Sequence, residues 1–285
     1  MKLSIRKKRV SRSAGGDFFL FVVLALGAAF MALPLIFMIN HAFKPLNEIF
    51  LFPPQFFVRN PTFNNFSDLF ILMSESWVPF TRYFSNSLVI VIFGTGGHVL
   101  AASMGAYVVS KHDFPGKKSF STIVLLALMF APQVTAIPNY IILSRIGWIN
   151  TLYSMIIPAW AFPLGFYLMS KFMSQIPDTL LEAAKIDGAT EFSTFWKIVM
   201  PFVKPAWLTL MILSFQQLWI NTGGRFIYTE AIKPLPAALF QIAAAGVARQ
   251  GVFAAVQLIL AAVPILLFVF NQSKIVETMG TSGID

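Results

Sequence analysis

The sequence has 285 residues, of which 57% are hydrophobic and only 12% charged. In an average soluble domain about a quarter of the residues are charged. The composition therefore excludes an ordinary soluble domain and indicates a polytopic membrane protein. The net charge of +9 does not indicate nucleic-acid binding, because the basic residues are distributed between apolar segments rather than gathered on one soluble face. Cysteine is absent, which excludes disulfides, thiolate metal sites and a cysteine nucleophile.

The N-terminal region combines a basic tail with a long apolar run. Residues 1–17 contain six Lys and Arg residues, and we expect this tail to stay in the cytoplasm. Residues 18–39 carry no charge over 22 positions, which gives about 33 Å of helix and is enough to cross a bilayer core. A secretory signal has a shorter apolar region followed by a cleavage site. We therefore interpret 18–39 as a retained span that opens a transmembrane domain, 18–285.

The second predicted span covers 87–109 and follows a polar, aromatic loop, 40–86, on the extracytoplasmic side. Small residues recur in this span at four-residue spacing, a pattern that lets membrane helices approach closely. These small residues are Gly97, Ala101 and Gly105.

The third predicted span, 119–138, follows a short basic connection, 110–118. It contains Pro132, which frees a backbone carbonyl and should bend the helix. The adjacent Gln133 is a polar candidate for the lining of a pathway through the membrane. We expect 139–150 to be a short external link.

The fourth and fifth predicted spans cover 151–170 and 203–221. The fifth carries a polar stripe on one helical face, with Gln216 beside it. Polar groups in lipid are costly unless paired, so this face should point into the bundle or a wet cavity. Two interpretations stay open: these residues line a substrate pathway, or they form hydrogen bonds between helices. The stripe consists of Leu210, Ser214, Gln217 and Asn221.

The sixth predicted span, 251–270, follows an external loop, 222–250, and precedes a polar tail, 271–285. Six spans return both termini to the same side of the membrane. The segments on that side hold 14 of the 21 Lys and Arg residues. This bias predicts that both termini and the stretch 176–204 lie in the cytoplasm.

The stretch 176–204 is too charged to lie in lipid and has the pattern of two short amphipathic helices. Asp178 is placed to cap the first helix, and Gly188 to end it in a left-handed turn. The apolar residues of the first helix are Leu180, Ala183 and Ala184. Those of the second recur on one face before Pro201, and they are Phe192, Phe195, Trp196 and Val199. Such a pair suits docking into the groove of a partner.

The stretch 176–204 resembles a signature of a known family. Glu182-Ala183-Ala184, Gly188 and the segment 198–201 are spaced as in the EAA signature of binding-protein-dependent ABC importer permeases, with Met200 where leucine is usual. The resemblance extends from about the first span to the C-terminus and is to the carbohydrate importers, of the maltose-permease type. It implies an all-α type I ABC importer permease fold with six transmembrane helices. The residues that it assigns to ATPase coupling are Glu182, Ala183, Ala184, Asp187, Gly188, Phe192 and Pro201. An ordinary interfacial hairpin is the alternative for this stretch.

The resemblance also implies partners. These are a second homologous permease subunit, two cytosolic ATP-binding subunits that bind ATP and Mg, and an extracytoplasmic solute-binding protein. The chain itself would be a non-catalytic, multi-pass subunit of the cell membrane without a bound cofactor or metal. Weaker similarities at 218–239 and 277–285 point to an oligosaccharide as the transported sugar, and neutral sugars suit amide and aromatic side chains.

The spans contain no aspartate or glutamate, and His98 is their only ionisable residue away from an end. Ion-coupled carriers usually need intramembrane carboxylates or broken-helix ion sites, so an ATP-independent carrier or channel is the alternative function. The histidines have no metal-ligand spacing. We expect His98 to be a hydrogen-bonded packing residue.

Overall fold

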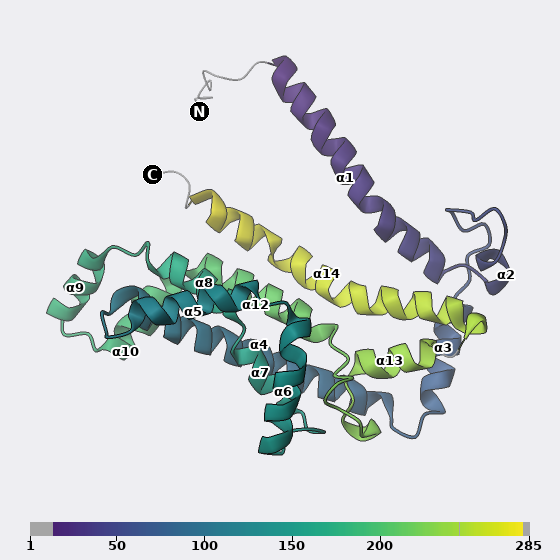
Figure 1. Cartoon of the computed structure of the whole chain (residues 1–285). Coiled ribbons are helices and arrows are strands. Elements are labelled where there is room, and N and C mark those ends of the chain that lie inside the picture. Colours follow the sequence, from purple (N-terminus) through teal and green to yellow (C-terminus); the bar gives the residue numbers. More distant parts are fainter. Residues whose placement is uncertain (1–13, 245, 282–285) are drawn as a thin grey trace.

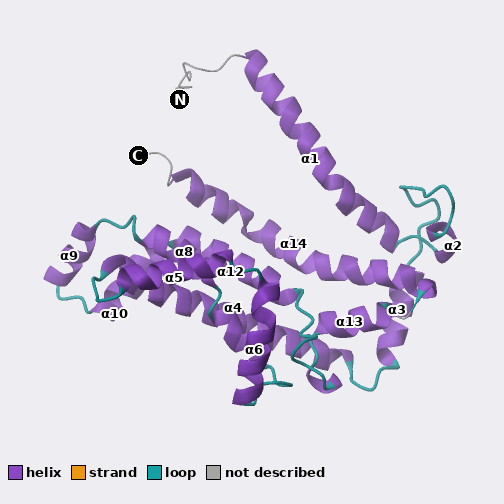
Figure 2. Cartoon of the chain, viewed as in Figure 1, coloured by secondary structure: helices purple, strands orange, loops and turns teal. Residues whose placement is uncertain are grey.

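The computed structural model describes residues 14–244 and 246–281, which form a bundle of helices (Figures 1 and 2). Within these ranges the chain forms no strand, and the all-α prediction is confirmed. Most of the predicted basic tail, 1–13, lies outside the described residues.

Four stretches of the described chain are long and apolar enough to cross a membrane. They lie in α1 (Ala14–Ala42), in α4 (Phe80–Lys111), in the consecutive helices α7 (Tyr153–Trp160) and α8 (Pro163–Met173), and in α14 (Gln250–Thr281). Each contains the core of a predicted span.

Two bent pairs of helices bring the number of spans to six if each pair is counted once. The first pair is α5 (Lys117–Met129) and α6 (Pro132–Ile146), whose axes differ by 113°. The second joins the segment Glu191–Phe202 to α12 (Lys204–Trp219) at 80°. Figure 1 shows α6 running across the direction of α5.

The break between α5 and α6 follows from Pro132. A residue before proline is driven out of the helical region, and Ala131 is extended, with φ −67° and ψ 141°. The helix therefore stops and restarts with proline in its first turn, where the missing N–H costs nothing. The sequence pattern predicts a bend at this proline within one span. In the structure α6 instead continues to Ile146, through much of the expected link.

Helix α4 is the central element and packs against α7, α8, α12 and α13 (Leu235–Ala243). Two of its predicted small residues receive aromatic side chains. A Cβ at position 97 would collide with the indole of Trp160, whose Nε1 donates a 2.9 Å hydrogen bond to the Phe93 carbonyl. A Cβ at Gly105 would lie 3.1 Å from the Phe166 ring. Gly97 and Gly105 thus allow aromatic rings to pack directly on the surface of α4. Ala101, the third small residue, is exposed.

Two buried apolar clusters lie along α4. The first half of the helix contributes Tyr83 and Ile90 to a cluster with Trp219 and Leu239. The second half contributes to a cluster with α8 and the stretch 195–210. Members of this second cluster include Ala106, Tyr107, Met169, Met173, Phe195, Val199 and Leu210. One helix, α4, thus joins both clusters.

Helix α1 lies beside the bundle rather than within it. None of its most apolar window is buried in the chain, and Figure 1 shows it diverging from α14 towards the N-terminus. A helix satisfies its own backbone hydrogen bonds, so an apolar helix can stand in lipid without neighbours.

The loop after α1 is folded around two buried polar residues. It contains α2 (Leu46–Ile49) and leads to α3 (Asn64–Ser74). The Glu48 carboxylate accepts hydrogen bonds from the backbone N–H groups of Arg59 and Asn60 at 3.0 and 2.9 Å. Buried Lys44 donates to the Gln55 carbonyl. The segment between α12 and α14 carries η2 (Glu230–Ile232), α13 and η3 (Val247–Arg249).

Candidate functional site

Helix α9 (Asp178–Ile186) ends in the left-handed turn that the sequence predicts. Gly188 has φ +79°. Its N–H donates to the Lys185 carbonyl at 3.0 Å, and the Ala189 N–H donates to the Ala184 carbonyl at 2.9 Å. These two bonds form a Schellman motif, in which the left-handed position is usually glycine because it lacks a Cβ. The turn fixes the angle at which the chain enters the next helix.

The predicted cap of α9 is wrong. Pro177 occupies the N-cap position, and Asp178 is the first helical residue. Its carboxylate lies 2.7 Å from Nζ of Lys111, which also donates to the Ile176 carbonyl. Asp178 therefore ties the loop to the end of α4, and its charge favours the helix N-terminus.

The apolar face predicted for α9 is divided, and only Ala184 of its three residues is buried. Leu181 and Ala184 are the buried residues, whereas Leu180 and Ala183 are exposed. The face turned away from the chain follows helical spacing, and Ile186 on it is 86% exposed. The residues of this face are Glu182, Ala183, Ile186 and Asp187.

The second helix of the loop is assembled from three short pieces: α10 (Glu191–Thr194), the π-helical turn η1 (Phe195–Val199) and α11 (Met200–Phe202). Thr190 caps it by accepting a 3.3 Å hydrogen bond from the Ser193 N–H. Pro201 has no N–H, and its ring would crowd a carbonyl one turn earlier. The wider π turn before it removes that conflict, so the helix passes through Pro201 rather than ending before it.

The π turn divides the apolar face predicted for this helix. Phe195 and Val199 are buried in the cluster beside α4, whereas Phe192 is 71% and Trp196 39% exposed. The rings of Phe192 and Trp196 contact each other, with centroids 6.1 Å apart. One half of the predicted face thus anchors the loop, and the other half is available to a partner.

Glu191 fastens the loop to the bundle. Its carboxylate accepts a 2.9 Å hydrogen bond from the Tyr107 hydroxyl and lies 3.0 Å from Nζ of Lys185. The Lys185 ammonium first, and then the Tyr107 hydroxyl, hold the pKa of Glu191 below its usual value. A carboxyl whose pKa is lower when folded stabilises the folded loop above its unfolded pKa, and this contribution is lost as the pH falls through the folded pKa. At neutral pH, Glu191 is therefore ionised and holds the loop to α4.

We group the exposed residues of the two helices under one name, the outer face of the loop. It combines the acidic and small residues of α9 with the two exposed rings of the second helix. Figure 1 shows α9 and α10 at one end of the bundle, opposite α3 and α13. Its members are Glu182, Ala183, Ile186, Asp187, Phe192 and Trp196. Of the other predicted coupling residues, Gly188 and Pro201 are also exposed, whereas Ala184 is buried.

The predicted polar stripe of the fifth span differs in burial along its length. Leu210 and Ser214 are buried within the bundle, and Ser214 Oγ has no hydrogen-bond partner among the described residues. Gln217 is exposed and Gln216 half-buried. Asn221 lies beyond the end of α12, and its Oδ1 accepts a 3.0 Å hydrogen bond from the Gly223 N–H. Asn221 therefore does not continue the helical face, because α12 ends at Trp219.

Gln133, the remaining predicted pathway residue, is exposed on α6. It belongs to the other bent pair of helices. His98 behaves as the sequence predicts for a packing residue. It is buried between helices, with Nε2 3.3 Å from the Phe162 carbonyl.

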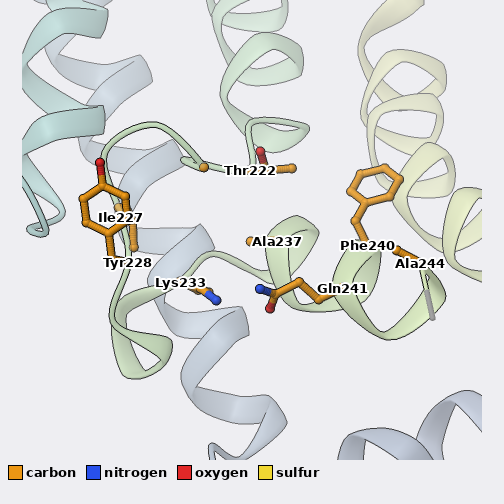
Figure 3. A pocket seen from close by; sticks show the side chains of 9 residues that line it. Thr222, Ile227, Tyr228, Lys233, Ala237, Phe240, Gln241 and Ala244 are labelled. Carbon is orange, nitrogen blue, oxygen red and sulfur yellow. The ribbon is translucent and has the colours of Figure 1, made fainter. Parts of the chain in front are cut away.

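A cavity of about 490 Å³ lies beside the end of α12, and Thr222, the residue after Asn221, is part of its lining. Figure 3 shows the Lys233 and Gln241 side chains pointing towards one another, with the Tyr228 and Phe240 rings on either side. Nζ of Lys233 lies 2.6 Å from Glu230, which offsets its charge. Aromatic rings and amide groups in a nearly neutral cavity suit a hydroxyl-rich ligand. Thr222 completes the polar lining.

The sequence patterns did not indicate these cavity residues. Thr222, Lys233 and Gln241 belong to separate parts of the segment between α12 and α14, and only the folding of that segment brings them together. The signal that could have found them is the loop's position directly after the polar end of the fifth span, together with its Gly223-Gly224 pair.

Residues 97–278 match the family described as "Binding-protein-dependent transport system inner membrane component". The galactooligosaccharides transport system permease protein GanQ of Bacillus subtilis (strain 168) is 28% identical over 277 residues, which cover 93% of this chain and 94% of that protein.

Two crystal structures are similar in fold. One is a bacterial ABC transporter involved in the import of the acidic polysaccharide alginate, with a TM-score of 0.76 at 19% identity over 93% of this chain and 99% of that chain. The other is a bacterial alginate ABC transporter in complex with an alginate pentasaccharide-bound periplasmic protein, with a TM-score of 0.62 at 17% identity over 92% and 96% of the two chains.

Proposed function

The chain belongs to the family of binding-protein-dependent transport system inner membrane components, and we propose that it forms half of the translocation pathway of an ATP-driven sugar importer. It is a multi-pass membrane protein with the fold of an importer permease. The energy would come from cytosolic ATP-binding subunits that dock on the loop 176–204.

The observation that carries this proposal is the contrast between the two sides of that loop. The inner side is fixed to α4 through Asp178 and Glu191, and its apolar residues are buried. The outer face leaves Ile186 and Phe192 unburied. Exposed apolar residues rimmed by charged ones mark interaction sites, and a rigid attachment is what the transmission of movement requires.

The proposed assembly follows the family. A second homologous permease would complete the pathway, two ATP-binding subunits would bind ATP and Mg, and an extracytoplasmic solute-binding protein would deliver the sugar. The periplasmic protein in the similar alginate transporter supports the last partner. We place both termini in the cytoplasm of a cell whose inner or plasma membrane holds the chain, because the basic residues gather on that side.

A carbohydrate is the cargo that we propose, and an oligosaccharide in particular. The galactooligosaccharide and alginate transporters that this chain resembles support it. The cavity beside Asn221 has the lining that sugars use, with the Tyr228 ring for stacking and the Gln241 amide for hydrogen bonds. We propose that the sugar pathway runs from this cavity along α12 past the exposed Gln217. The half-buried Gln216 and the exposed Gln133 would also line it. Ser214 is turned into the bundle and would act from behind them.

Uptake by the reconstituted complex tests this proposal. The chain is placed in proteoliposomes with its sister permease, the ATP-binding subunits and the binding protein, and entry of a labelled oligosaccharide is measured. We expect uptake only when ATP and the ATP-binding subunits are present. Equal uptake without them would instead support a carrier or channel.

A further inference from the structure

A second cavity, of about 310 Å³, lies between the last turn of α4, the start of α5 and the end of α8. No feature of the proposed transport cycle accounts for it. Its polar lining consists of two lysines and four serines, which are Lys117, Lys171, Ser110, Ser121, Ser170 and Ser174. These residues gather at the same end of the bundle as the loop 176–204.

The two lysines give the cavity a positive charge. Within the described chain Lys171 forms no ion pair, and its ammonium lies over the Tyr167 ring, 5.5 Å from the centroid. Lys117 lies 2.9 Å from Asp113, whose side chain is 98% exposed. Exposed ion pairs of this kind are weak, so Lys117 can exchange its partner for a better-placed anion.

Ser170 supplies a hydrogen-bond donor that the protein does not use. Three of the serines donate to backbone carbonyls of their own helices: Ser110 to Tyr107, Ser121 to Lys117 and Ser174 to Lys171. The hydroxyl of Ser170 is buried and has no partner in the described structure. A buried unpaired polar group is costly, and an anion bound here would satisfy it.

The lining changes from polar to apolar along both helices. On α5, Lys117 and Ser121 are followed on the same face by Val124 and Leu125. On α8 the order is reversed, because that helix runs back towards the loop: Phe166 comes first and Lys171 last. Helix α5 has no buried residue within the described chain, so this chain leaves the apolar face of α5 uncovered. The cavity therefore presents cations at the membrane surface and apolar side chains towards the membrane interior.

We propose that this cavity binds an anionic phospholipid of the cytoplasmic leaflet. The lipid phosphate would lie between Lys117, Lys171 and Ser170, and an acyl chain would follow Leu125 and Phe166. Basic pockets between membrane helices on the cytoplasmic side suit such headgroups. This inference rests on the orientation proposed above, but not on the identity of the cargo. Because α8 leads directly into the loop 176–204, the bound lipid would brace the base of that loop.

Lipid retention by the purified complex tests the proposal. The complex is placed in nanodiscs of phosphatidylcholine with phosphatidylglycerol, and the phosphatidylglycerol molecules that stay bound are counted by native mass spectrometry. Lys171→Gln should weaken retention about five-fold. Lys118→Gln is the matched control, since it removes a neighbouring exposed charge that does not line the cavity, and it should leave retention unchanged.

Three results would overturn the proposal. Equal loss in both variants would show general attraction to a basic surface. Displacement of the lipid by soluble glycerol phosphate at equal concentration would assign the site to a soluble anion. Crosslinking of a cysteine at Ser170 to a partner subunit would make the cavity a protein interface. The lipid is counted without any transport, so failure of this proposal and failure of the proposed import are distinguishable.

Discussion

The Tyr107 hydroxyl donates a 2.9 Å hydrogen bond to the Glu191 carboxylate. This bond joins the last turns of the central helix α4 to the first residue of α10. The Tyr107 ring also packs against Phe195, with centroids 5.5 Å apart. The contact combines a charged hydrogen bond with a buried ring, so we expect it to transmit displacement of the loop to α4.

Tyr107→Phe keeps the ring and removes the hydroxyl. Hydrogen bonds to charged groups are stronger than neutral ones, so we expect the second helix of the loop to open more often. Hydrogen exchange should become faster at residues 191–202, while α9 changes less because Asp178 still holds it. Tyr153→Phe, on an exposed ring of α7, is the control. Unchanged exchange in Tyr107→Phe would mean that apolar packing alone holds the helix.

Replacements of Gly188 separate backbone strain from side-chain bulk. The positive φ costs ordinary L-residues about 1–2 kcal/mol, and asparagine tolerates it better. Within this chain no atom lies within 4 Å of a Cβ built at this position, so we attribute the effect to the backbone rather than to obstruction. We expect Gly188→Val to weaken binding of the ATP-binding subunits and Gly188→Asn to retain it, in a pull-down from detergent. Similar losses in both variants would show that the partner contacts this position directly.

Gln217 and Asn221 have different surroundings, so their variants should differ. Gln217→Leu keeps the size of the side chain, and loss of a hydrogen bond to sugar costs about 1–3 kcal/mol. Uptake should fall while expression and ATPase binding stay normal. Asn221→Asp keeps the oxygen that accepts the hydrogen bond of the Gly223 N–H. Asn221→Leu loses this oxygen and should therefore disturb the turn in addition to any effect on uptake. Normal uptake by Gln217→Leu would favour a packing role for this residue.

The cysteine-free sequence allows a direct test of topology. Single cysteines at Lys117 or Thr190 should react with an impermeant thiol reagent only after the membrane is opened. Cysteines at Asn64 or Lys233 should react in intact cells. Labelling of position 190 from outside would overturn the assignment of the loop to the cytoplasm.

Local signals predicted part of this structure well. Gly188 ends α9 because the turn depends on a few neighbouring backbone groups, and the long apolar runs give helices of spanning length. The apolar face from Phe192 to Val199 was predicted as one surface, but the π turn before Pro201 divides it. A hydrophobic period of 3.6 residues assumes a regular α-helix and does not predict a π turn.

The remaining differences depend on contacts distant in sequence. Asp178 pairs with Lys111 of α4 rather than capping its own helix, and no local pattern indicates that choice. The cavity beside Asn221 combines Thr222, Lys233 and Gln241, and no periodic pattern places these residues together. The break at Pro132 was foreseen as a bend, but the direction of α6 after it was not.

The most direct test of the account is the binding of the ATP-binding subunits to a permease pair that carries Glu182→Leu. Glu182 lies on the outer face, away from the contacts that fold the loop, so the variant should insert and pair normally. We predict weaker binding and loss of sugar-stimulated ATP hydrolysis, with Asn64→Ala on the extracytoplasmic side behaving as wild type. Unchanged binding and hydrolysis in Glu182→Leu would contradict the assignment of the outer face to the ATPase interface.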